Sequence, residues 1–141
     1  MSAPHDDPLA GHRPAPVPLN FSAPFWAAAQ EGSLLLQRCT RTGAFQFYPR
    51  PVSIATGGRE LEWVAASGRG TVYSFTITHR SPLPAKGIRP YIVALVDLEE
   101  GVRLMVNLVD CPPEAVCIGM AVSLAWVKAG EMNFPAFAPA G

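Results

Sequence analysis

The alternation of apolar and polar side chains is clearest between residues 67 and 80. Tyr73, Phe75 and Ile77 alternate with hydroxyl side chains, and a period of two is typical of a strand with one buried face. Gly68 and Gly70 precede this run, and glycine there permits a sharp bend, a bulge or close approach of another backbone. We therefore expect the first long strand of a small barrel over residues 64–79.

Four further strands follow from the same patterns. A continuous apolar run predicts one at 90–98, alternation predicts two at 102–109 and 119–127, and a short edge strand at 131–137 closes the sheet. Pro135 suits an edge, because proline cannot donate to a sheet ladder. A loop with one helical turn lies between the third and fourth strands. The chain is therefore predicted to be mainly β, with a five-stranded OB-fold barrel over residues 61–141.

The residues before the barrel predict three smaller units. Residues 1–20 are rich in proline without apolar periodicity, which predicts a flexible arm. Residues 21–33 predict a short helix, because Ser22 can cap it, Pro24 suits its first turn and Gly32 suits its exit. A helix this short is marginal alone in water, so it must pack against another part of the protein or against a partner. We expect it to dock on its own barrel, the alternative being a lid or a partner interface.

Two turn-like segments within residues 34–60 share one layout. A predicted strand at 34–38 precedes the first turn, and a second at 44–48 connects the first turn to the second. Each turn has two positions separated by two residues and then a glycine: Cys39 and Thr42 before Gly43, and Ser53 and Thr56 before Gly57. This is the layout of two zinc knuckles, but neutral hydroxyls bind zinc poorly. We expect no zinc here. A plain hairpin with two glycine turns explains the spacing equally well.

The amino-acid composition excludes several classes of protein. The 141 residues are 49% hydrophobic, which is enough for a core. The zero formal net charge excludes a bulk basic field for nucleic acid or an anionic membrane. No apolar run approaches the roughly 20 residues that span a bilayer, and the N-terminus lacks a signal-peptide pattern. Three cysteines without framework spacing suit a reducing compartment. We expect a cytoplasmic protein.

The sequence offers only weak catalytic candidates. His79 is a candidate general base, with Asp97 or Asp110 to orient it, although a histidine at a strand end is more often a hydrogen-bonded surface residue. Cys111 and Cys117 are candidate nucleophiles, but nothing nearby provides the electropositive setting that favours a thiolate. We expect ordinary packing for both cysteines.

Two histidines in the arm, His5 and His12, are a conceivable metal pair. Solvated histidines are the commoner explanation in a tail of this composition. We therefore predict no metal site anywhere in the chain.

Residues 24–137 resemble the DUF35 family, in which a rubredoxin-like zinc ribbon precedes an OB-fold. The resemblance rests on the order and spacing of Phe25-Trp26, Leu36-Gln37-Arg38-Cys39, Phe47-Tyr48-Pro49-Arg50, residues 68–76, residues 90–96 and Gly119-Met120. The family pattern has cysteines at positions 39, 42, 53 and 56, of which this chain keeps one. The resemblance implies an accessory subunit that binds an acyl-CoA thioester, and in some members completes the active site of a thiolase-like partner.

A coenzyme A site needs cations for the phosphates, an aromatic face for the ring and an apolar funnel. The candidate residues are Trp26, Arg69, Tyr73, Arg80, Arg89, Tyr91 and Arg103. Arg80, Lys86 and Arg89 also lie close to His79, in or beside an irregular proline-rich loop over residues 81–90.

Two other hypotheses stay open. A single-stranded nucleic-acid binder with an OB-fold needs a basic groove with stacking aromatics, and the zero net charge argues against it. A structural protein that serves only assembly predicts no ligand at all. The acyl group, the reaction, the partner and any self-association are not specified by the sequence.

Overall fold

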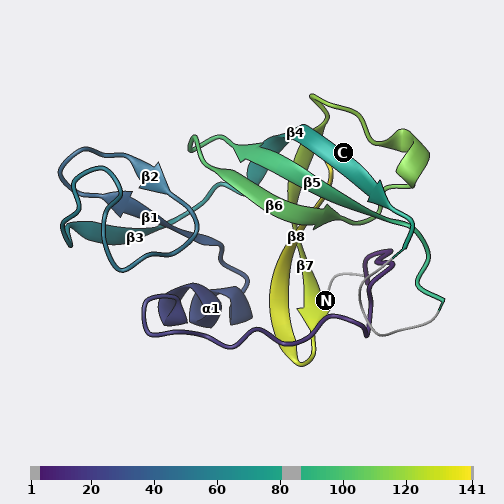
Figure 1. The fold of residues 1–141 in the computed structure, drawn as a ribbon, viewed down its shortest axis with the longest axis horizontal. Helices are drawn as coiled ribbons and strands as arrows, with labels where there is room; N and C mark the ends of the chain where they lie inside the picture. The colour runs from purple at the N-terminus through teal and green to yellow at the C-terminus, as the bar shows by residue number, and fades with distance from the viewer. Residues whose placement is uncertain (1–3, 81–86, 141) are drawn as a thin grey trace.

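The computed structural model describes residues 4–80 and 87–140, so Lys86 and most of the predicted 81–90 loop lie outside the described residues. The chain forms a small three-stranded sheet, here called the ribbon, a short helix and a closed barrel (Figure 1). The helix and the ribbon strands are α1 Ala23–Gln30, β1 Leu35–Cys39, β2 Phe45–Gln46 and β3 Leu61–Ala65. The barrel contains β4 Arg69–Thr78, β5 Tyr91–Leu98, β6 Arg103–Leu108, β7 Ala121–Ala129 and β8 Met132–Pro139.

The barrel confirms the predicted fold class of a mainly β chain with a five-stranded OB-fold. Its strand order is β4-β5-β6-β8-β7, closed by pairing of β7 with β4. The helical turn expected between the third and fourth strands is the 3₁₀ helix η1, Pro113–Ala115. Each of the four later strands lies within two residues of its predicted bounds.

The predicted strand over 64–79 is wrong as a single element. Its first part belongs to β3, which pairs with β1 in the ribbon, and its second part is β4 in the barrel. The chain turns between them at Gly68, whose φ of +79° favours glycine. Both strands are half-buried, so the alternation of apolar and polar residues continues in the sequence across this turn. That alternation alone predicts one strand.

Of the alternatives that the two glycines permit, the structure has the bend at Gly68 and a close approach at Gly70, while β4 carries a bulge further along, at Tyr73. The register against β5 shifts between Val72 and Ser74, which turns Tyr73 outward. At Gly70, an added Cβ would lie 2.6 Å from the carbonyl oxygen of Asp97. Only glycine allows the two backbones to come this close.

The barrel is weakly joined between β6 and β8. These strands pair at one position, Leu108↔Phe137, whereas β8 pairs with β7 along its whole length. The β7–β8 hairpin extends away from the rest of the barrel, and α1 lies beside it (Figure 1). We call the contact between β6 and β8 the seam.

Helix α1 docks on its own barrel, as predicted. Phe25 is 3% exposed and belongs to the same core cluster as the barrel residues Val106 and Phe137. Burying a side chain of this size contributes about 2 kcal/mol. Pro24 lies in the first turn as expected, but the Ser22 hydroxyl does not cap the helix and instead bonds with Leu19.

Two buried glutamines hold the ribbon together. Gln46 donates from Nε2 to Gln37 Oε1 (2.9 Å) and to Val52 O (3.0 Å), and its Oε1 accepts from Ile54 N (2.9 Å). Gln37 exchanges two 2.8 Å bonds with the backbone of Arg50. The segment from 50 to 54 has no regular structure of its own, so these side chains satisfy its backbone groups.

The N-terminal arm from residue 4 to residue 20 contains no helix or strand and lies along the barrel (Figure 1). Arg13 forms an ion pair with Asp7, and both side chains are only 6% exposed. Arg13 also donates to Asn107 Oδ1 on β6 at 3.0 Å. A second, exposed ion pair joins Asp6 to Arg89. The flexibility expected of this segment stays a prediction.

Replacing Gln46 tests the glutamine network. Gln46→Met keeps the length of the side chain but leaves Val52 O and Ile54 N without these partners, so we expect the free energy of unfolding to fall by about 3 kcal/mol. Urea denaturation measures this. Because the volume is nearly conserved, a loss below about 0.5 kcal/mol would show that the hydrogen bonds contribute little.

Replacing Arg13 tests the attachment of the arm. Arg13→Ala leaves the Asp7 carboxylate buried without its cation, so the arm should detach and chymotrypsin should cleave at Phe21 about tenfold faster. The control is Arg89→Ala, which breaks the exposed pair and should change cleavage by less than about threefold. Equal cleavage rates in the two variants would contradict the role of the buried pair.

Candidate functional site

An apolar groove of about 290 Å³ opens beside the seam, where the arm, α1, the ribbon and the barrel meet. The arm contributes Val17, Leu19 and Phe21. The remaining walls come from Phe25 and Trp26 of α1, from residues 47–49 that follow β2, and from β6 and β8 of the barrel. Four stretches that are far apart in sequence, residues 17–26, 47–49, 104–106 and 134–135, therefore build one recess.

Aromatic packing fixes the floor of the groove. Trp26 stacks on Phe134 of β8 with a centroid distance of 5.8 Å, and Phe25 contacts Phe47 at 5.7 Å. Trp26 also meets Phe25 edge-on at 4.8 Å. Such pairs prefer these offset and edge-on geometries, so the floor is apolar and well packed.

The rim of the groove carries large apolar side chains that face solvent. Val17 is 84% exposed, Met105 61%, Leu19 56% and Tyr48 50%. A cluster of exposed apolar side chains around a recess is typical of a ligand-binding or protein-binding surface, whereas single exposed ones are ordinary. Of the predicted site residues, Trp26 alone lines this groove.

The barrel arginines of the predicted site are paired with carboxylates. Arg69 contacts Glu99 through two hydrogen bonds of 2.8 and 2.9 Å, which raise the pKa of Arg69 and lower that of Glu99. Arg103 makes the same type of contact with Asp97, whose pKa it lowers. The Arg103 guanidinium also lies 3.4 Å from the centroid of the Tyr73 ring. Arg103 and Tyr73 are therefore brought together, but Asp97 already neutralises the charge of Arg103.

The other predicted binding residues lie at the opposite end of β5. Arg89 pairs with Asp6, and Tyr91 is 8% exposed. Six residues of strand, about 20 Å at 3.3 Å per residue, separate Tyr91 from Asp97 and its partner Arg103. Arg80 is exposed just beyond the end of β4. The predicted residues thus do not converge on one site.

The candidate catalytic residues are also separate. Asp110 bonds to His5 Nδ1 at 2.6 Å, and Asp97 bonds to Arg103, so neither is shown orienting His79. Burial raises the pKa of Cys111, while Cys117 is exposed. The geometry gives these residues no nucleophile–base contact.

The two ribbon turns have the same backbone geometry. In each, the amide of the glycine donates to the carbonyl four residues earlier, Gly43 to Cys39 and Gly57 to Ser53. Cys39 is buried, and hydrogen bonds from Ser53 and Thr42 lower its pKa to about 7. One thiol and three hydroxyl positions do not match the cysteine and histidine ligands of a structural zinc site. We therefore derive no role for zinc, and a zinc-free ribbon stays a prediction.

The sequence interpretation missed a second recess, which we call the ribbon cleft. It measures about 430 Å³, adjoins the apolar groove at Phe21, and includes Arg50, Arg59 and Trp63. These residues come from the loop after β2, the turn before β3 and β3 itself. Their positions along the chain gave no signal that they converge.

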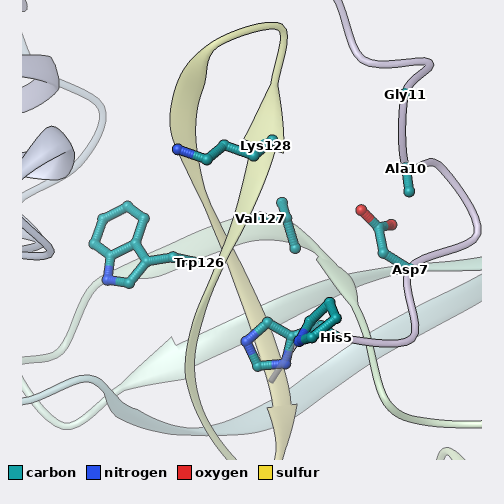
Figure 2. A pocket seen from close by; sticks show the side chains of 8 residues that line it. His5, Asp7, Ala10, Gly11, Trp126, Val127 and Lys128 are labelled. Carbon is teal, nitrogen blue, oxygen red and sulfur yellow. The ribbon is translucent and has the colours of Figure 1, made fainter. Parts of the chain in front are cut away.

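A third cleft of about 270 Å³ lies between the arm and β7 (Figure 2). Asp7 and Lys128 face it from opposite sides, and the Lys128 side chain extends away from Asp7. The Lys128 amine donates to Asn133 Oδ1 at 2.8 Å. Asp7 and Lys128 are therefore both satisfied within the protein.

Among the residues described, no group of three or more metal-ligating side chains is present, and no helix has the length and apolar character needed to cross a bilayer.

Comparison with known proteins identifies both parts of the chain. The model of the ChsH2 rubredoxin-like zinc ribbon domain matches residues 26–52, and the model of the ChsH2 C-terminal OB-fold domain matches residues 63–127. Over 130 residues, the chain is 41% identical to a probable enoyl-CoA hydratase alpha subunit of Thermomonospora curvata. That match covers 91% of this chain and 40% of the relative, so the chain spans about two fifths of that protein.

Two further matches cover larger shares of the proteins concerned. A DUF35 domain-containing scaffold protein of Methanocaldococcus jannaschii is 35% identical over 95 residues, which is 67% of each chain. The solved structure described as "Ltp2-ChsH2(DUF35) aldolase" superimposes with a TM-score of 0.81 at 38% identity, covering 90% of this chain and all of that one. The predicted resemblance is thereby confirmed, and the chain belongs to the DUF35 family.

Proposed function

We propose that this chain is an accessory component that holds an acyl-CoA thioester for a thiolase-like partner enzyme, in the cytoplasm, with its own residues at most co-catalytic. The apolar groove is the observation that carries the proposal. Its volume of about 290 Å³ is at the small end of ligand pockets, so it suits the acyl portion of a thioester rather than the whole molecule.

The relatives support a role alongside another component. One is named as the alpha subunit of a probable enoyl-CoA hydratase, and the name of the solved structure joins Ltp2 and ChsH2 in an aldolase. A thiolase-like partner follows from the family resemblance alone. The absence of a nucleophile–base contact among the described residues is consistent with chemistry performed by the partner.

An assembly protein without a ligand is the second candidate. The archaeal relative is named as a scaffold protein, and the barrel arginines are engaged with carboxylates rather than free for phosphates. Under this alternative the exposed rim of the groove contacts a partner protein directly. A test must therefore separate binding of a ligand from binding of a protein.

Introducing a charge at the rim tests the groove. Met105→Glu places a carboxylate beside the apolar recess, so the Kd for decanoyl-CoA, measured by calorimetry, should rise about tenfold or more, because the acyl chain would have to desolvate that charge. The control is Ile118→Glu, since Ile118 is 70% exposed but does not line the groove. Equal affinity of the two variants would contradict acyl binding in the groove.

Copurification tests the partner. The tagged chain should retain a thiolase-like protein in stoichiometric amount from extract of its native cell, identified by mass spectrometry. The pair should cleave or condense an acyl-CoA that neither protein converts alone. Recovery of the chain without a partner would contradict the proposal, and a retained partner with no thioester binding would favour the assembly role.

A further inference from the structure

The ribbon cleft is lined by two arginines that have no carboxylate partner. Six of the nine arginines in the sequence form ion pairs with aspartate or glutamate: Arg13, Arg38, Arg41, Arg69, Arg89 and Arg103. Within the part of the chain that the structure describes, the other three are Arg50, Arg59 and Arg80, and two of these three line the same cleft. The cleft is therefore positive within a chain of zero net charge.

The neighbouring acidic groups are directed elsewhere. Glu62 lies on β3 between Leu61 and Trp63, so alternation places it on the opposite face from these two cleft residues. There it pairs with Arg38 at 3.5 Å. The Glu60 carboxylate accepts from Thr56 at 3.0 Å and lies 3.9 Å from Arg41. Neither carboxylate is bound to Arg50 or Arg59.

The backbone around the cleft is held in place before any ligand arrives. Both the amide and the carbonyl of Arg50 bond to the buried Gln37 side chain at 2.8 Å. Gln37 pairs in register with Trp63 across β1 and β3. This arrangement fixes the backbone of the exposed Arg50 in the same cleft as the partly buried Trp63.

We propose that the ribbon cleft binds the phosphorylated adenine nucleotide of the thioester, with Arg50 and Arg59 on the phosphates and the Trp63 ring against the base. Arginine is suited to phosphate oxygens because it donates two parallel hydrogen bonds, and aromatic rings stack on any base. This inference rests on the proposed function, since the cleft adjoins the apolar groove at Phe21. It replaces Arg69, Arg89 and Arg103 as phosphate ligands, because binding there would break existing ion pairs.

The experiment uses the full chain and coenzyme A without an acyl group, which separates the cleft from the groove. Nuclear magnetic resonance follows the indole N–H signals, with Trp63 as the reporter and Trp126, which lines the third cleft (Figure 2), as the internal control. Coenzyme A should shift the Trp63 signal and leave Trp126 unchanged. Arg50→Ala with Arg59→Ala should raise the Kd about tenfold or more.

The matched control is Arg69→Ala with Arg103→Ala, which removes the same charge from the barrel and should change the Kd by less than about threefold. Loss of binding in this control, with binding kept in the cleft variant, would overturn the inference and leave the proposed function standing. Equal affinity for inorganic phosphate would overturn the assignment to a nucleotide. If the unmodified chain bound neither coenzyme A nor decanoyl-CoA, both the inference and the proposed function would fail.

Discussion

The single residue pair that joins β6 to β8 is the constraint on which the rest of the structure depends. The two strands pair only at Leu108↔Phe137, so the hydrogen-bond ladder between them is incomplete. Apolar side chains beside this gap are left for other segments to pack against. Phe25 of α1 is buried among them, in one core cluster that also contains ribbon and barrel residues. The apolar groove is lined by residues 104–106 and 134–135 of the same two strands, beside this incomplete ladder.

The ribbon depends on the same shared core. Leu34 and Leu36 belong to the cluster that contains the barrel residues, so the ribbon does not have to fold alone. Structural zinc in small isolated domains contributes about 10–16 kcal/mol of binding free energy to folding. Here the glutamine network holds the segment that leads into the second turn, and both turns carry the same glycine-to-carbonyl hydrogen bond although their side chains are poor zinc ligands.

Charge pairing decides which surfaces remain available for an anion. Each barrel arginine that the sequence suggested for phosphate binding is held by a carboxylate, Arg69 by Glu99 and Arg103 by Asp97. These exposed pairs contribute little to stability, yet they cancel the local field. Of the three arginines without such partners in the described part of the chain, two line the ribbon cleft, and this makes the ribbon, rather than the barrel face, the surface suited to a nucleotide.

The sequence by itself determined the strand periodicity, the glycine turns, the order of ribbon and barrel, and the family, because these are properties of short segments and their spacing. Only the tertiary structure decided that β3 joins the ribbon, since two half-buried strands look alike across Gly68. It also decided that Arg69 meets a carboxylate 30 residues away, and that Arg50 and Trp63 share a cleft. These outcomes depend on which distant segments pack together, and local periodicity carries no information about that.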